Sequence, residues 1–523
     1  MTDTAAAPAV KKADAPLFEG AEWNFDTIQR VHDTVEKIAV GEMGLNVYPN
    51  QIEVITAEQM LDAYASSALP LLYKHWSFGK AFAQQEMLYR KGFRGLAYEI
   101  VINSSPCISY IMEENTALMQ TLVIAHAAFG HNHFFKNNYV FQQWTDAEGI
   151  LDYLDFAQSY IAECEQKYGH GEVERLLDAA HALQTQGVFR YPRKKVPDLK
   201  SEERKFRERQ LHEERVYDDL WRTLPKPTGT AAPMDSREEA RRKALLQLPQ
   251  ENILYFLEKT APMLKGWQRE VLRIVRNIAQ YFYPQRQTKM MNEGCATWTH
   301  YTIMGTLHDR GLIPDGAYLE FLQSHTNVVF QPEYDDPRYS GLNPYAVGFA
   351  VMRDIERACL TPDDEDRQWF PDIAGCRDPI NVLKDTWHNF RDESFIQQYL
   401  GPKVIRSFRL FNLSDDSDDP TYLVRAIHNE RGYREIRNRL AWHYDIARME
   451  PDIQVVDVDL TGDRRLMLRH RSIDGVLLDE ADARRVLGYL ADLWGYDVLM
   501  TETDAETDMI LKEHKAGPRR RFG

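Results

Sequence analysis

Two segments of the chain carry side chains that could bind one metal ion together. The first, residues 123–133, contains His126 and His131, and the second, residues 291–300, contains Glu293. Both segments are otherwise mostly apolar, and imidazole and carboxylate groups are costly to bury without a polar partner. A divalent cation such as zinc, which takes nitrogen and carboxylate ligands, is a partner that accounts for both segments.

The spacing of these residues restricts how they can act. His126 and His131 are five residues apart, about 140° on a regular α-helix, so sharing one ion requires a local bulge that Gly130 could absorb. Without the bulge, one histidine is a hydrogen-bonded core residue and the other is a helix cap. Glu293 and His300 share a helix face but lie roughly 10 Å apart along it. One of them is therefore a ligand and the other supports it or carries a proton, unless Glu293 is simply paired with a nearby arginine.

Three further side chains could transfer protons or bind an oxyanion. Glu99 lies in an apolar stretch, and Glu113 precedes the histidine segment. Either acid could be a general base or a member of a buried ion pair. Tyr345 follows Asn343 and Pro344 at a predicted helix start, where its phenol could stabilise an oxyanion. The alternative for this motif is a helix N-terminus, with Asn343 as its cap and Pro344 in its first turn.

Composition narrows the class of protein. The 523 residues carry a formal net charge of −16, which disfavours electrostatic binding of nucleic acid. Hydrophobic residues make up 44% of the chain, as expected for a globular protein, but no uninterrupted apolar run is long enough to span a bilayer. The five cysteines include no CxxC pair, so we expect reduced thiols and a cytoplasmic location.

The hydrophobic periodicity predicts an α+β protein with a large, mainly helical N-terminal domain and a small α+β C-terminal domain. Apolar residues three and four apart predict helices after Trp23 and again after Glu251, including a long central helix over residues 110–128. After Gly401, strands alternate with helices up to a last strand at residues 497–502. The expected domains are a disordered tail (1–20), the first half of a helical core (21–223), a flexible charged linker or insertion (224–250), the second half of the core (251–400) and the α+β domain (401–523).

Longer motifs run through most of the chain. They are Gly95–Asn103, Met112–Thr116, His126 with Gly130-His131-Asn132, Phe134–Asn138, Tyr281–Gln285, Met291–Gly294, His325–Pro332 and Asn343–Tyr345. With these motifs the sequence resembles the SpoVR family, the stage V sporulation protein R-like proteins, from about Trp23 to about Val498. One departure is Cys295, which stands where the family commonly has tryptophan; it concerns the packing of the second segment rather than the ligands.

The resemblance implies a soluble bacterial protein of the cytoplasm. In spore formers the family name implies a role in making the spore cortex, and relatives in other bacteria are associated with stress and starvation. The family tends to accompany a PrkA-type serine kinase and a protein with a von Willebrand factor A-like domain. A non-catalytic regulatory or scaffold protein that acts with these partners is therefore one expected function.

The candidate metal segments are also similar to those of gluzincin-type metallopeptidases, which implies a zincin-like helical core. In that comparison His126, His131 and Glu293 are the three protein ligands, and water is the fourth. Those peptidases carry their general base directly after the first histidine, where this chain has Ala127. Another residue must therefore transfer the proton if the protein is a hydrolase.

Four residues could supply the missing chemistry. Glu99, Glu113 or His300 could transfer the proton, and Tyr345 or His300 could stabilise the oxyanion. With these residues, the first expected function is a zinc-dependent hydrolase of an amide or peptide bond. Manganese or iron fits the same ligands nearly as well as zinc.

Overall fold

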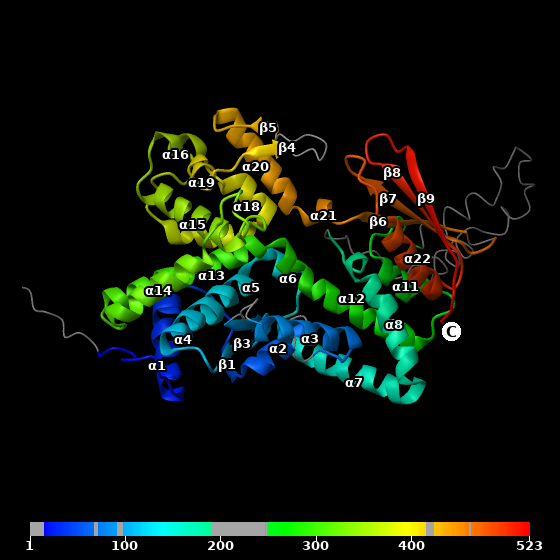
Figure 1. Cartoon of the computed structure of the whole chain (residues 1–523), viewed down its shortest axis with the longest axis horizontal. Coiled ribbons are helices and arrows are strands. Elements are labelled where there is room, and N and C mark those ends of the chain that lie inside the picture. Colours follow the sequence, from blue (N-terminus) through cyan, green and yellow to red (C-terminus); the bar gives the residue numbers. More distant parts are fainter. Residues whose placement is uncertain are drawn as a thin grey trace, which may run out of the picture. The chain divides into compact units, whose positions relative to one another are not determined.

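The structure, a computed structural model, describes residues 15–66, 72–91, 98–190, 246, 248–414, 423–459 and 462–522. The chain divides into two compact units: unit 1 comprises Met1–Lys167 and Tyr281–Met449, and unit 2 comprises Tyr168–Gln280 and Glu450–Gly523. A large, mainly helical part and a small α+β C-terminal part confirm the predicted fold class (Figure 1). The expected tail and the expected linker at 224–250 lie mostly outside the described residues.

A three-stranded sheet in unit 1 corrects one prediction. The sequence predicts a single helix over residues 110–128, but the first three of these residues belong to β3 (Cys107–Met112). β3 lies between β1 (Asn50–Ile55), which is parallel to it, and β2 (Glu99–Ile102), which is antiparallel, and all of its residues are buried. A strand buried on both faces is a continuous apolar run, which periodicity does not distinguish from a buried helix.

The helices that carry the candidate site form the centre of unit 1 (Figure 1). After β3 the chain enters α4 (Ala117–Val123), continues through a π-helical segment, η2 (Ile124–His131), and passes into α5 (Asn132–Asn137). α13 (Lys289–Asp309) packs against both η2 and α15 (Pro344–Leu360). Their buried apolar side chains contribute to the main core of the unit. The site is therefore built on packed helices rather than on loops.

The remaining elements of unit 1 surround this core. Thr56 caps the helix that follows β1 through a capping box, as its position before an apolar stretch predicts. The elements are α1 (Phe25–Glu36), η1 (Lys37–Glu42), α2 (Ala57–Ala65), α3 (Trp76–Arg90), α6 (Tyr139–Trp144), α7 (Ile150–Tyr168), α14 (Asp315–Val328), α16 (Asp364–Trp369), α17 (Pro379–Asn389), α18 (Asp392–Tyr399), α19 (Pro402–Ser407), β4 (Asn412–Ser414), β5 (Leu423–Ala426), α20 (Glu430–Tyr444) and α21 (Ile446–Met449).

Unit 2 contains a four-stranded sheet that α22 (Glu480–Trp494) packs against. β6 (Asp452–Val458) and β7 (Leu466–Ser472) form an antiparallel hairpin, and β7 runs parallel to β8 (Val498–Asp504). A further strand, β9 (Ile510–Ala516), follows the one predicted to be last. β9 is an edge strand rich in charged residues. Its sequence therefore lacks the apolar pattern from which a strand is predicted. The other described helices of unit 2 are α8 (His170–Ala182), η3 (Gln184–Gln186), α11 (Ile253–Thr260) and α12 (Gly266–Gln287), which continues into unit 1.

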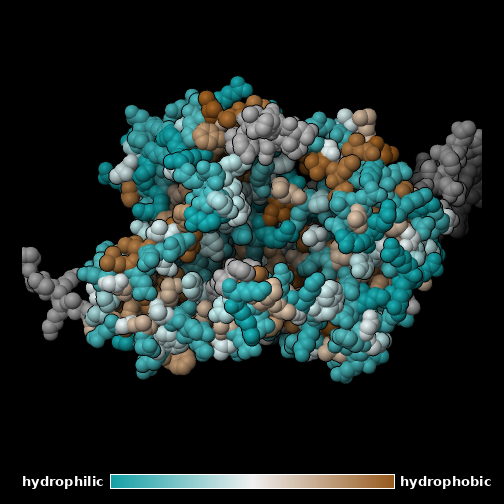
Figure 2. Space-filling view, in the orientation of Figure 1, coloured by the Kyte–Doolittle hydropathy of each residue, from teal (hydrophilic) through white to brown (hydrophobic). Residues whose placement is uncertain are grey.

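The protein surface is mostly hydrophilic on the face seen in Figure 2. Apolar residues gather at the end of the four-stranded sheet, where Val476, Met509 and Ile510 are 68%, 62% and 61% exposed. In the described part of the chain, no helix combines the length and the apolar character that crossing a membrane requires.

Candidate metal centre

A π-helical segment brings the two histidines together. On a regular α-helix, His126 and His131 would point to different faces. Both belong to η2, whose wider turns bring their ring centroids to 4.6 Å from each other. The local distortion that the five-residue spacing requires is therefore present. Isolated π-helical turns are rare, and they are found frequently at functional sites.

Glycines set the short distances between the helices of the site. A Cβ atom on Gly130 would lie 2.6 Å from the Cα atom of Ala296 on α13, and one on Gly294 would lie 2.7 Å from the carbonyl carbon of Gly348 on α15. A larger residue at either position would push the helices apart. Gly130 is not among the residues with positive φ, so its role is the close contact with α13 rather than a special backbone conformation.

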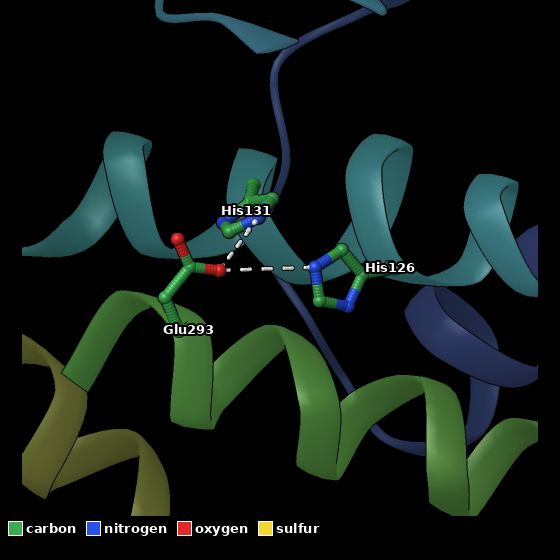
Figure 3. A group of neighbouring side chains, drawn as sticks. All are labelled: His126, His131 and Glu293. Carbon is green, nitrogen blue, oxygen red and sulfur yellow. Dashed lines mark ion pairs between the residues drawn. The ribbon is translucent and has the colours of Figure 1, made fainter. Parts of the chain in front are cut away.

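Glu293 on α13 points towards the two histidines (Figure 3). Its Oε2 atom lies 3.6 Å from His131 Nε2 and 4.0 Å from His126 Nε2, and one ligand atom from each of the three residues lies within 4.8 Å of the others. Glu99 on β2 joins this cluster, with its Oε1 atom 3.7 Å from His126 Nε2. Two imidazoles and two carboxylates from three elements form a donor set that suits zinc, manganese or iron.

The electrostatics of the cluster favour a cation. Burial, together with the neighbouring imidazoles, holds the pKa of His126 well below its usual range, so the ring is neutral, as a metal ligand must be. Burial and the nearby Glu293 raise the pKa of Glu99 to about 8. The Oε2 atom of Glu293 is buried without a hydrogen-bond partner, and no described lysine or arginine forms an ion pair with either carboxylate. The Glu293 carboxylate needs a positive charge that these described residues do not supply.

A chain of three imidazoles extends from His126. Its Nδ1 atom is 2.9 Å from His300 Nδ1, and His300 Nε2 is 3.1 Å from His325 Nδ1. Burial holds the pKa of His300 well below its usual range and lowers that of His325 to about 4, so both rings are neutral near pH 7. His131 is held in a similar way, because its Nδ1 atom lies 2.9 Å from the side-chain oxygen of Asn292. Each histidine of the cluster thus has its second nitrogen engaged, as ligating histidines usually do.

A pocket of about 410 Å³ opens onto the cluster, and its lining includes Glu99, His126 and Tyr345. Burial and the nearby Glu293 carboxylate raise the pKa of the Tyr345 phenol, which therefore keeps its proton. Asn343 caps α15 with proline in the first turn. The motif is therefore a helix N-terminus, and it also places Tyr345 at the pocket.

The structure assembles most of the predicted site residues, but not all of them. Glu113 is exposed in the turn after β3 and does not line the pocket. Conversely, Asn292 and His325 were not among the predicted site residues. Their positions in the sequence could have identified them as site residues, because Asn292 directly precedes Glu293 and His325 is the first residue of one of the longer motifs. Their contacts with the other histidines depend on helix packing, which the sequence does not display.

Comparisons with known proteins cover almost the whole chain. Residues 22–449 match the family described as SpoVR like protein, and residues 451–505 match the SpoVR-like C-terminal domain. An uncharacterized protein of Escherichia coli (strain K12), YcgB, is 51% identical over 506 residues, which cover 97% of each chain. No solved structure matches. The candidate metal centre falls within the first matched region, and the chain belongs to the SpoVR family.

Proposed function

We propose that the protein is a metal-dependent hydrolase of an amide or peptide bond, with His126, His131 and Glu293 as the protein ligands. The observation that carries the proposal is the convergence of their ligand atoms from η2 and α13, in a cluster where the Glu293 Oε2 atom is buried without a hydrogen-bond partner among the described residues. A bound divalent ion would act as a Lewis acid and lower the pKa of water. Zinc suits the two imidazoles and the carboxylate, and manganese or iron would fit the same donors.

Glu99 is the proposed general base. The position that carries this base in gluzincin-type peptidases is Ala127 here. Glu99 reaches the ligand atom of His126 from β2 instead, at 3.7 Å, and burial raises its pKa above the ordinary value in the metal-free protein, which strengthens it as a base. In this role the carboxylate accepts a proton from the attacking water and returns it to the leaving nitrogen. Glu113 is exposed and away from the pocket, so it does not compete for this role.

Tyr345 is the proposed oxyanion donor. Its phenol lines the pocket and retains its proton, so the hydroxyl can donate to a developing negative charge on the substrate carbonyl oxygen. His300 also lines the pocket, but its contact with His126 Nδ1 supports a different role. In the proposal, His300 positions the ligand.

The pocket lining supports a substrate without negative charge beside the reacting bond. Met119, Leu122 and Val328 supply apolar surface, and no lysine or arginine is among the described residues that line the pocket. A substrate carboxylate would therefore meet Glu99 without a lysine or arginine to compensate its charge. A neutral or positively charged group next to the amide fits this lining better.

Metal content tests the ligand set. Full-length protein purified without chelators is analysed by inductively coupled plasma mass spectrometry, together with the variants His126→Ala and Glu293→Gln. The wild type should hold a stoichiometric metal and both variants should lose it. His308→Ala is the matched control, because His308 lies on α13 outside the cluster and contacts Asp315. Equal, sub-stoichiometric metal in all four proteins contradicts the proposal.

Turnover tests the hydrolase. A panel of amides and peptides that differ only in the charge beside the scissile bond is offered to the metal-loaded protein. Cleavage of neutral and cationic members is expected. Glu99→Gln should retain metal and lose at least a hundredfold in rate, which separates a failed base from a failed metal site. A metal-loaded wild type that cleaves no amide in the panel leaves the hydrolase proposal without support.

Partner binding without catalysis is a second candidate function. The exposed apolar cluster of Val476, Met509 and Ile510 at the end of the unit 2 sheet favours protein contact. The family resemblance implies a PrkA-type serine kinase and a von Willebrand factor A-like protein as partners. Val476→Asp should weaken capture of the partner by the full-length chain, whereas Leu319→Asp, at a similarly exposed site on α14, should not. The sequence from 190 to 222 is densely charged and is a second possible docking segment, but most of it lies outside the described residues.

A further inference from the structure

Two of the five cysteines, Cys359 and Cys376, are 17 residues apart in the sequence and lie beside each other at the end of α15. Cys359 is the penultimate residue of the helix and is fully buried, and Cys376 lies in the exposed segment before α17. Burial and the neighbouring Cys376 thiol raise the pKa of the Cys359 thiol. The other three cysteines are buried, so Cys376 is the thiol of the chain that is open to solvent.

The backbone holds this pair in place. The Gly375 N–H donates to the Ala358 carbonyl at 2.9 Å, and the Arg377 N–H donates to the Cys359 carbonyl at 3.1 Å. These two bonds flank Cys376 and lay its segment against the last turn of α15. Because these backbone bonds place the two residues beside each other, we expect a disulfide to close with little movement of the chain.

We propose that Cys359 and Cys376 form a reversible intramolecular disulfide when the protein meets a peroxide. The exposed Cys376 thiol loses its proton, the thiolate sulfur attacks hydrogen peroxide and the O–O bond breaks. The leaving hydroxide takes up a proton, so sulfenic acid and water form. The Cys359 sulfur then attacks the Cys376 sulfur, and the thiol proton leaves with the sulfenic hydroxyl as a second water. Two thiols are oxidised, one peroxide is reduced, and a thiol reductant restores the pair.

The order of the two steps follows from exposure. Peroxide reaches Cys376 from solvent, whereas Cys359 is within the core and burial raises its pKa to about 12. Cys359 therefore stays a thiol until a sulfenic acid forms beside it. The bond would fasten the segment before α17 to the C-terminal end of α15, the helix that begins at the candidate site. This chemistry is independent of the proposed metal and of hydrolysis.

Mass spectrometry of the full-length protein tests the proposal. After hydrogen peroxide treatment and removal of excess oxidant, the intact mass should fall by two hydrogen atoms. A non-reducing digest should contain one cross-linked peptide that joins Cys359 to Cys376, and dithiothreitol should reverse both changes. Oxidised protein should also unfold at a higher temperature than the reduced form.

Variants make the outcome decisive. Cys376→Ser changes an exposed side chain and should abolish the mass change in a folded protein, while Cys164→Ser should leave it intact. In Cys359→Ala, the sulfenic acid on Cys376 should persist and be trapped by dimedone. If that variant does not fold, dimedone should still trap the Cys376 sulfenic acid on the wild type during early oxidation. A wild type that keeps five free thiols, or a cross-link that maps to another pair, overturns the proposal.

Discussion

His126 and His300 face each other through their Nδ1 atoms, 2.9 Å apart. Two ring nitrogens form a hydrogen bond only if one carries a hydrogen and the other offers a lone pair. With the hydrogen on His126 Nδ1, its Nε2 lone pair is free on the side where Glu99 and Glu293 lie. His300 then carries its own hydrogen on Nε2, which donates to His325. This contact therefore accommodates the tautomer that makes His126 a ligand.

Removing the acceptor should weaken metal binding without destroying the ligand set. In His300→Ala, the His126 ring loses the hydrogen-bond partner of its Nδ1 atom, and the affinity for zinc should fall about 10–100-fold. Competition with a chromophoric chelator measures the change. His308→Ala, at a partly exposed position of the same helix, should leave the affinity unchanged, and equal affinities in both variants would refute the positioning role.

How much the sequence reveals differs between the residues of the site. His126, His131 and Glu293 can be identified because charged or polar groups in apolar segments need a partner. The π-helical form of η2 cannot be identified in this way, because local propensity does not distinguish a π-helix from an α-helix. The π-helical segment occurs where the chain packs against α13. Glu99 joins the cluster through the pairing of β2 with β3, a long-range contact. Helical periodicity misses β3 itself because buried strands and buried helices are both continuously apolar.

The contact between η2 and α13 should be sensitive to a single methyl group. Gly130→Ala places a Cβ atom 2.6 Å from the Ala296 Cα atom, so the helices must separate. The free energy of unfolding should fall by about 1–3 kcal/mol, and zinc affinity should fall as well because Glu293 moves away from the histidines. Gly305→Ala on α13 is the control, since a Cβ there would meet only the Tyr318 hydroxyl at 3.9 Å. That variant should be neutral or more stable, as urea denaturation would measure.

Asp392 should determine where α13 begins. Its two carboxylate oxygens accept from the backbone N–H groups of Met290 and Met291 at 2.8 and 2.9 Å, and α13 has no side-chain cap of its own. Asp392→Ala leaves both buried donors unpaired and should cost on the order of 1–3 kcal/mol of unfolding free energy. Asp392→Asn keeps one acceptor oxygen, so its unfolding free energy should lie between those of wild type and Asp392→Ala. Glu393→Ala, next to it but paired with Arg391, is the control, and a loss as large as that of Asp392→Ala would contradict the capping role.

The metal-free protein should become less stable as the pH rises through the range in which Glu99 ionises. The pKa of Glu99 is about 8 in the folded protein, against an ordinary value of 4.5. Between these values the folded state binds a proton that the unfolded chain does not, so the free energy of unfolding falls with rising pH. This contribution is complete below the ordinary value and is lost as the pH passes through about 8.

Comparison with Glu99→Gln isolates this contribution. The variant cannot ionise, so its stability relative to wild type should improve by on the order of 2 kcal/mol between about pH 5 and pH 8; the side chain retains 19% of its exposure, which limits the effect. The difference in unfolding free energy between the two proteins removes the contribution of His126. The lowered pKa of His126 reduces the stability of both proteins as the pH falls below the ordinary value of 6.5. Urea denaturation in chelator measures the difference, and parallel curves for the two proteins would contradict the raised pKa. Added zinc should reverse the trend in wild type alone, because a cation beside the carboxylate favours its charged form.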